Sequence, residues 1–182
     1  MPYYPYGVRE KNHKRIFETD SMKLSTRARY ALRLMVTLAR HTNGDNSVVS
    51  LSQVSREAKI SRRYLEQLVI GLKNASLIRG RSGKGGGYCL ALPADQIRIR
   101  QIIESAIGPI NIVECVMQPE ICLKSDLCEC RMLYQLINQR ITGVLDGLVL
   151  SDLAVRGRMK GLVTTLDGFS DGVESFGGRL CD

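Results

Sequence analysis

The chain has 182 residues, a formal net charge of +8 and a sequence pI of about 9.4, a length that favours one or two small domains. Its apolar content of 44% and charged content of 24% are those of a folded globular protein and exclude an intrinsically disordered one. No run approaches the ~18 apolar residues of a membrane span, and the basic start has no apolar stretch behind it, so we expect a cytoplasmic protein without a secretory signal.

The chain opens with an irregular stretch and then a regular helix. Residues 1–21 contain three tyrosines and two prolines without any apolar period, which is typical of a flexible arm. From Ser25 to His41 apolar residues recur at helical spacing, with Ser25 or Thr26 in a position to cap the first turn. We therefore predict a first helix over this segment.

Two shorter helices are predicted after the break "NGDNS". They are "SLSQVSREAKI", capped by Ser50 or Ser52, and "SRRYLEQLVIGLKNASL", capped by Ser61. They meet at residues 59–61, which leaves room only for a tight turn, and the third helix is strongly basic at its start. The order, the turn length and the charge together predict a helix-turn-helix that binds DNA.

A β-hairpin is predicted next, around the glycine-rich stretch "RSGKGGGYCLA" at 81–91. Apolar and polar residues alternate on both sides of its tip. A nucleotide-binding P-loop needs glycines before the lysine and a helix after it, whereas here the lysine precedes three glycines and a strand follows. If the hairpin only connected two strands, its turn would need one or two glycines and would not explain the three basic residues. We therefore interpret the hairpin as the wing of a winged helix.

Positive charge is concentrated in this part of the chain. Between Arg56 and Lys84 there are eight basic and two acidic residues, which places six of the eight net charges in 29 residues. A solvated surface usually alternates in sign, so this one-sided cluster indicates a polyanionic partner, which we take to be double-stranded DNA.

Candidate DNA contacts follow from this placement. Arg63 has the donors to bridge guanine, Gln67 matches adenine and Glu66 accepts from cytosine, although each side chain alone is equally compatible with simple solvation. The full candidate set is Ser61, Arg62, Arg63, Glu66 and Gln67 on the third helix and Arg79, Arg81 and Lys84 in the wing.

A second helical part is predicted after Pro93. "QIRIRQIIESAIG" has an apolar face, and an apolar stripe from Arg131 to Leu148 predicts a helix of about 17 residues, followed by a short turn at "SDLA". The stripe is wide, so the long helix packs either on its own domain or on a second copy. A dimer is favoured because winged-helix proteins commonly bind two half-sites. Residues 156–182 hold six glycines and read as a tail.

The predicted fold class is therefore mainly α with a small β-hairpin wing: a winged helix-turn-helix followed by a long C-terminal dimerisation helix. The predicted organisation is an N-terminal arm (1–21), a DNA-binding domain (22–97), a cysteine loop with dimerisation helices (98–155) and a flexible tail (156–182).

Four of the six cysteines fall within 16 residues, at positions 115, 122, 128 and 130, in a segment without a clear period that we expect to be a loop. Thiolates are soft ligands suited to zinc or to an iron–sulphur cluster. The paired Cys-x2–4-Cys knuckles of structural zinc sites are absent, which favours an iron–sulphur cluster over zinc, and metal-free redox-active thiols are a third possibility. The isolated Cys89 and Cys181 read as a small apolar residue and a spare thiol.

No enzyme signature emerges. The two histidines, His13 and His41, have no nucleophile or carboxylate partner suggested by spacing, so we do not expect an enzyme. An electron-transfer protein would carry the cysteines without needing the basic third helix or the wing.

From about Met22 to Ala154 the chain resembles the Rrf2 family of bacterial winged-helix regulators, which includes iron–sulphur regulators and nitric-oxide sensors. The resemblance is carried by "MKLSTRARYAL", "ISRRYLEQL", "GKGGGYCLA", "IGPINIVECV", "LCECRMLY" and "LSDLA". It implies a homodimeric transcription regulator, such as a repressor, whose cysteine loop projects toward the DNA-binding part of the other subunit. It also implies that Cys115, Cys122 and Cys128 hold a [2Fe–2S] or [4Fe–4S] cluster.

Two positions depart from the family pattern. The fourth cluster ligand of relatives is a histidine or an acidic residue, at positions occupied here by Arg131 and Arg29, and arginine is not a plausible ligand. We therefore take Cys130 as the candidate fourth ligand. In the wing, the family arginine that enters the minor groove aligns with Ser82, so Arg81 is the nearest substitute.

Overall fold

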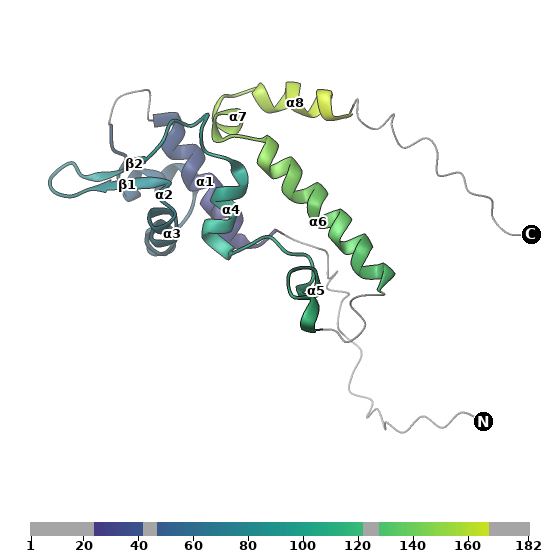
Figure 1. Cartoon of the computed structure of the whole chain (residues 1–182). Helices are drawn as coiled ribbons and strands as arrows, with labels where there is room; N and C mark the ends of the chain where they lie inside the picture. The colour runs from purple at the N-terminus through teal and green to yellow at the C-terminus, as the bar shows by residue number, and fades with distance from the viewer. Residues whose placement is uncertain (1–23, 42–46, 122–127, 168–182) are drawn as a thin grey trace, which may run out of the picture.

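The computed structural model describes residues 24–41, 47–121 and 128–167, and the arm predicted at 1–21 lies outside them. Figure 1 shows a lobe that carries a protruding hairpin, and a long helix that extends away from it. No described helix is long and apolar enough to cross a membrane. The elements are α1 (Thr26–His41), α2 (Leu51–Ala58), α3 (Arg62–Asn74), β1 (Ile78–Arg81), β2 (Gly87–Leu90), α4 (Ile99–Ile107), α5 (Glu114–Met117), η1 (Pro119–Ile121), α6 (Glu129–Gly147), α7 (Leu150–Ala154) and α8 (Arg158–Asp167).

Local hydrogen bonds explain where α2 and α3 begin. The Ser50 hydroxyl accepts a hydrogen bond from the backbone N–H of Gln53 at 3.2 Å, and the Ser61 hydroxyl accepts one from that of Tyr64 at 3.3 Å. Such N-caps each stabilise a helix by about 1 kcal/mol. Between them the turn is closed by Ser55, whose hydroxyl donates to the Ile60 carbonyl at 2.6 Å. The predicted helix-turn-helix is therefore present, and hydrogen bonds from Ser55 and to Ser61 hold its tight turn in place.

The hairpin is an antiparallel pair whose register runs from Ile78 opposite Leu90 to Arg81 opposite Gly87. Val49, between α1 and α2, exchanges two backbone hydrogen bonds with Tyr88, of 2.8 and 2.9 Å. This bridge holds β2 to the segment that leads into α2. The predicted wing is thereby confirmed as part of a mostly helical fold.

The core of the lobe joins α1 to the helices that follow it. Leu34, Leu38, Leu65 and Leu72 are fully buried there. Helix α4 supplies three more buried residues, Ile99, Ile102 and Ile103, although the sequence assigned it to the dimerisation part.

A close backbone approach seats α3 on α4. A Cβ atom added to Gly71 would lie 2.5 Å from the Ser105 carbonyl oxygen, so only glycine allows the two helices to come this near. Helix α3 is thus fixed by α4 as well as by α1.

Backbone and side-chain bonds tie the C-terminal end of α6 to the lobe. The Ile99 N–H donates to the Leu148 carbonyl at 3.0 Å, and the Leu150 N–H donates to the Ile97 carbonyl at 2.8 Å. Arg100 Nη1 also donates to Asp146 Oδ2 at 2.9 Å. Only this end of α6 is held so closely, and the rest of the helix extends from the lobe (Figure 1).

Three features of the C-terminal part differ from expectation. The cysteine segment is not a continuous loop, because α5 and η1 form within it. Helix α6 begins at Glu129, which brings Cys130 into its first turn. The expectation of a tail without regular structure is wrong for Arg158–Asp167, which form α8. Residues 168–182 lie outside the described residues, and the predicted domain boundaries stay a prediction.

Candidate nucleic-acid interface and cysteine segment

The start of α3 presents the predicted base-contacting residues to solvent. Leu65 and Leu68 are buried against the core, and this orientation turns the opposite face of the helix outward. The five candidates Ser61, Arg62, Arg63, Glu66 and Gln67 are all exposed. The structure therefore brings these side chains together on one accessible surface.

Two of these residues pair with one another. Arg62 Nε donates to Glu66 Oε1 at 3.1 Å, one turn apart, and both side chains are more than half exposed. Exposed pairs of this kind are worth at most about 1 kcal/mol. The pair therefore restricts the two side chains only weakly and leaves both on the same face of α3.

The wing carries the other three candidates. Arg79, Arg81 and Lys84 are exposed along β1 and the tip. The tip closes with Gly83 and Gly85 at φ values of 100° and 79°, a conformation that only glycine adopts at no steric cost. The glycines therefore shape a narrow tip whose basic side chains point into solvent.

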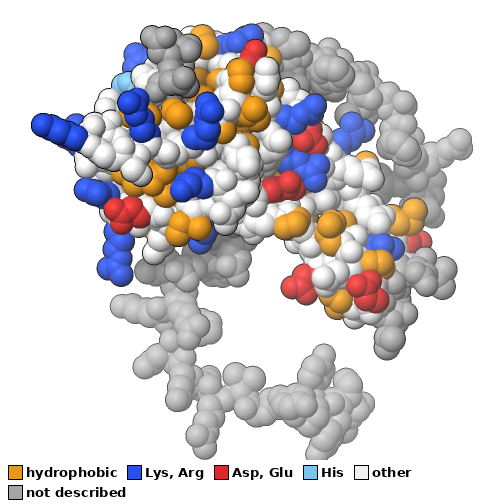
Figure 2. Space-filling model, turned by 60° about the vertical axis from the view of Figure 1, so that its left-hand side comes forward, with side chains coloured by type: hydrophobic (Ala, Val, Ile, Leu, Met, Phe, Trp, Pro, Cys, Tyr) orange, Lys and Arg blue, Asp and Glu red, His pale blue; other side chains and the backbone are white. Residues whose placement is uncertain are grey.

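The surface charge of the molecule is uneven. Figure 2 shows lysine and arginine side chains spread over the lobe with few acidic ones among them, and several acidic side chains together in the smaller part at the lower right. A positively charged face of this kind attracts the phosphate backbone of a nucleic acid.

Two aromatic residues that the sequence analysis did not single out connect α1 to the recognition helix. The rings of Tyr30 and Tyr64 meet edge to face with centroids 5.4 Å apart. The Arg33 guanidinium lies 5.8 Å from the centroid of the Tyr30 ring. Helical spacing indicates only which side of the first helix Tyr30 lies on, and nothing in the sequence predicts that it packs against Tyr64.

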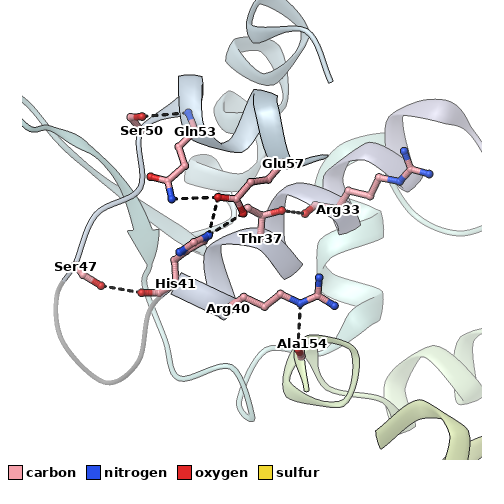
Figure 3. A network of polar contacts seen from close by, with 9 residues as sticks. All are labelled: Arg33, Thr37, Arg40, His41, Ser47, Ser50, Gln53, Glu57 and Ala154. Atoms are coloured by element: carbon pink, nitrogen blue, oxygen red, sulfur yellow. Dashed lines mark hydrogen bonds and ion pairs between the residues drawn. The ribbon is translucent and has the colours of Figure 1, made fainter. Parts of the chain in front are cut away.

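A polar network joins α1, α2 and α7 (Figure 3). His41 Nε2 lies 3.0 and 2.8 Å from the two Glu57 carboxylate oxygens, and Gln53 Nε2 donates to the same carboxylate at 3.1 Å. These hydrogen bonds, that from His41 first, hold the pKa of Glu57 below its ordinary value. Arg40 Nε donates to the Ala154 carbonyl at 3.1 Å. His41 thus has a carboxylate partner, although sequence spacing suggested none.

The cysteine candidates fall on two elements and the gap between them. Cys115 lies in α5 and is half-buried, Cys128 is the N-cap residue of α6 and is half-buried, and Cys130 is exposed. Cys122 lies outside the described residues. Arg131 Nε donates to the Cys115 carbonyl at 2.9 Å, which holds α5 against the start of α6.

Within the ranges that the structure describes, no three metal-ligating side chains lie together. Cys115, Cys128 and Cys130 are free thiols. Cys89 is also a free thiol but is buried in β2, as expected for a small apolar residue. The predicted ligand set therefore stays a prediction.

Comparison with known proteins agrees with this geometry. A family model named Rrf2 and described as an iron-dependent transcriptional regulator matches residues 24–156. The transcriptional regulator CymR of Bacillus subtilis is 40% identical over 134 residues, which cover 73% of this chain and 90% of CymR. The regulator IscR of Cereibacter sphaeroides is 46% identical over 90 residues, which cover 50% of this chain and 58% of IscR.

Solved structures show the same relationship. The structure titled as CymR, the global cysteine regulator of B. subtilis, is 34% identical, has a TM-score of 0.61, and matches over 74% of this chain and 97% of its own. T. potens IscR is 28% identical with a TM-score of 0.56, and the match covers 72% of this chain and 85% of its own.

Proposed function

Because this chain belongs to the Rrf2 family of transcriptional regulators, we propose that it is a dimeric, sequence-specific DNA-binding repressor controlled by its cysteine segment. The observation that carries the DNA-binding part is the exposed polar and basic surface shared by α3 and the wing. The Ser61 cap and the Val49–Tyr88 bridge hold its two halves in place. Helix α3 supplies base readers, and the wing supplies charge for phosphates.

The dimer part of the proposal rests on α6. Met132, Leu133, Leu136 and Val144 are all exposed by half or more on this helix. Large apolar side chains gathered on one helix face indicate a protein–protein contact. We propose that two copies meet through this face, so that each places one recognition helix in a half-site.

The experiment that tests DNA binding uses fluorescence anisotropy with duplexes selected in vitro from random sequence. A dimer that touches about 6–10 phosphates loses ~10³–10⁵ in affinity between 50 and 200 mM salt. Arg63→Ala is expected to cost about 1–3 kcal/mol and to relax base preference, whereas Lys84→Ala weakens all sequences alike and lowers the salt slope by about 2, one for each subunit of the dimer. Identical behaviour of both variants, or a flat salt profile, contradicts the assignment.

We further propose that Cys115, Cys122, Cys128 and Cys130 hold an iron–sulphur cluster, of [2Fe–2S] or [4Fe–4S] type. The chemistry of the donor set fits, because three described thiols are free and Arg131 holds α5 at the start of α6. A bound cluster would supply iron–sulphide bonds that oxidants or nitric oxide attack. The chain's own contribution is to order the segment around α5, and such coupling typically changes DNA affinity by ~1–3 kcal/mol.

Metal analysis of protein purified without oxygen tests the cluster. We expect iron and acid-labile sulphide in the unaltered protein, loss of both when Cys115, Cys122 or Cys128 is changed to Ser, and a weakened centre in Cys130→Ser. Cys89→Ser is the matched control, since this thiol is buried in the wing. A Cys130→Ser variant that retains iron like the unaltered protein places the fourth ligand elsewhere.

A cluster-free thiol switch is the second candidate. Arg131 stands where the resemblance places a histidine ligand, and its side chain is engaged with the Cys115 carbonyl. One structural neighbour is titled the global cysteine regulator. Iron-free protein whose DNA affinity changes on thiol oxidation supports this candidate, and colourless protein with stoichiometric zinc supports a structural zinc site.

A further inference from the structure

Helix α1 carries a row of arginines that the proposed function does not use. Arg29, Arg33 and Arg40 are four and seven residues apart, which places them within about 40° around the helix axis. All three are exposed. Arg40 is tied to the Ala154 carbonyl, and Arg29 donates only locally, to the Thr26 hydroxyl. The ion pairs of the described residues include none of the three.

The row lies beside the flank of α3 that carries base-contacting candidates. Tyr30, between Arg29 and Arg33, packs edge to face on Tyr64 of α3. Residues three apart on a helix are surface neighbours, so the ring of Tyr64 is next to Gln67. The aromatic pair therefore fixes the arginine row at a set distance from the recognition surface.

A groove of about 440 Å³ continues the row toward the helix-turn-helix. It runs between α1, the turn after α2 and α7, over an apolar floor that includes Val36 and Leu153. Arg33, Arg40 and Lys59 line it. Its one carboxylate, Glu57, is engaged by His41 and Gln53. The groove is therefore positive and suited to an anionic partner.

Lys59 occupies this groove at a conformational cost. It ends α2 in the left-handed region, at φ 56° and ψ 45°, where glycine is the usual residue. A lysine in this position gives up some stability and adds a positive charge to the groove. This is the pattern expected where the side chain serves binding.

We propose that Arg29, Arg33 and Lys59 bind the sugar–phosphate backbone of duplex DNA that flanks the segment contacted by α3. The inference rests on the proposed DNA-binding function and adds a second surface to it. DNA is the partner chosen because the row is cationic and continuous with the recognition helix. The face suited to a second copy of this chain is instead apolar and lies on α6.

The test compares two duplexes selected in vitro by binding to the unaltered protein, one with long flanks and one trimmed to the base-contacted segment. The variant with both Arg29→Gln and Arg33→Gln is expected to bind the long duplex at least about tenfold more weakly. Because it removes two charges from each subunit of the dimer, it should also lose about three to four units of salt slope. On the trimmed duplex it should match the unaltered protein. Base preference should stay unchanged, and Arg156→Gln, beyond α7, is the control.

Lys59→Gly separates binding from folding. Glycine relieves the left-handed strain, so the melting temperature is expected to rise by a few degrees, while affinity for the long duplex falls two- to fivefold. A purely structural role predicts the rise in stability without any loss of affinity, and that result overturns the contribution of Lys59.

The remaining outcomes are also decisive. Double-variant binding equal to that of the unaltered protein on long duplexes, or an equal loss on trimmed ones, overturns the flanking contact but leaves the proposed function standing. Dissociation of the dimer by the double variant, seen in sedimentation velocity, assigns the row to a subunit contact and also overturns it. Failure of the unaltered protein to bind any duplex overturns the proposed function and this inference together.

Discussion

The winged-helix lobe and helix α6 differ in how much of their apolar surface they bury. In the lobe, α1 alone buries six residues, and the helices around it bury Leu65, Leu72 and Ile102 almost completely. In α6, a helix of 19 residues, Asn138 is the one residue classed as buried. The lobe therefore has a core of its own, whereas α6 presents an apolar face that a single copy of the chain leaves in water.

The polar groups show the same contrast. In the lobe, serine hydroxyls close both ends of the helix-turn-helix turn. In α6, the buried Asn138 Oδ1 atom has no hydrogen-bond partner among the described residues. A buried polar atom without a partner costs about 1–3 kcal/mol. The lobe thus satisfies its buried polar groups within itself, whereas α6 leaves one unpaired, a contrast that agrees with the proposed role of α6 in a dimer.

The largest effect we predict breaks the lobe itself. Leu72→Ala removes a fully buried side chain between α3 and the core and is expected to lower the free energy of unfolding by about 2–5 kcal/mol. Leu136→Ala is the matched control, because its side chain is 51% exposed, and it should change the stability of the isolated subunit little. Urea denaturation at low protein concentration measures both. Equal losses would contradict the contrast between the two regions.

A second prediction sharpens the contrast at α6. Leu136→Glu introduces a charge into the exposed apolar face, so the dimer is expected to dissociate at least about 100-fold more readily while the lobe keeps its melting temperature. Sedimentation velocity measures the dimer, and DNA affinity should fall because one half-site remains. Gln96→Glu adds the same charge to an exposed position before α4 and should leave the dimer intact. If the Leu136→Glu variant remains dimeric, the dimer interface does not include this face of α6.

The lobe was the easier region to predict from the sequence, because its signals are local. The serine caps, the tight turn at Lys59 and the glycine-rich tip each determine structure within a few residues, and all of them appear as expected. Helix α4 was predicted as an element, but its burial in the core of the lobe was not. Its packing depends on the Gly71–Ser105 approach between distant segments, which no periodicity reveals.

The candidate site shows where such reasoning ends. Residue type and spacing predicted the candidate DNA-contacting residues on α3, which are exposed, but not the Arg62–Glu66 pair or the Tyr30–Tyr64 contact. In the cysteine segment the sequence identified the candidate thiols. It did not predict the hydrogen bond from Arg131 to the Cys115 carbonyl, because that bond is a tertiary contact. Helix α8 was missed because Gly161 within it and Gly157 just before it lower helix propensity.

The smallest effect lies where the lobe meets α7, in the network around Glu57. Hydrogen bonds from His41 and Gln53 hold the pKa of this carboxyl below its ordinary value of 4.5. A depressed pKa in the folded state adds stability above the ordinary value, and that stability is lost as pH falls through the folded value. Because the His41–Glu57 pair is exposed, we expect it to add less than about 1 kcal/mol to the free energy of unfolding.

The Glu57→Gln variant should therefore show a flatter dependence of stability on pH below pH 4.5, which thermal unfolding across pH measures. Glu120→Gln, on η1, is the control and should leave this dependence unchanged. If the profiles of the Glu57→Gln variant and the unaltered protein coincide, the hydrogen bonds from His41 and Gln53 to Glu57 contribute nothing to the stability of the lobe.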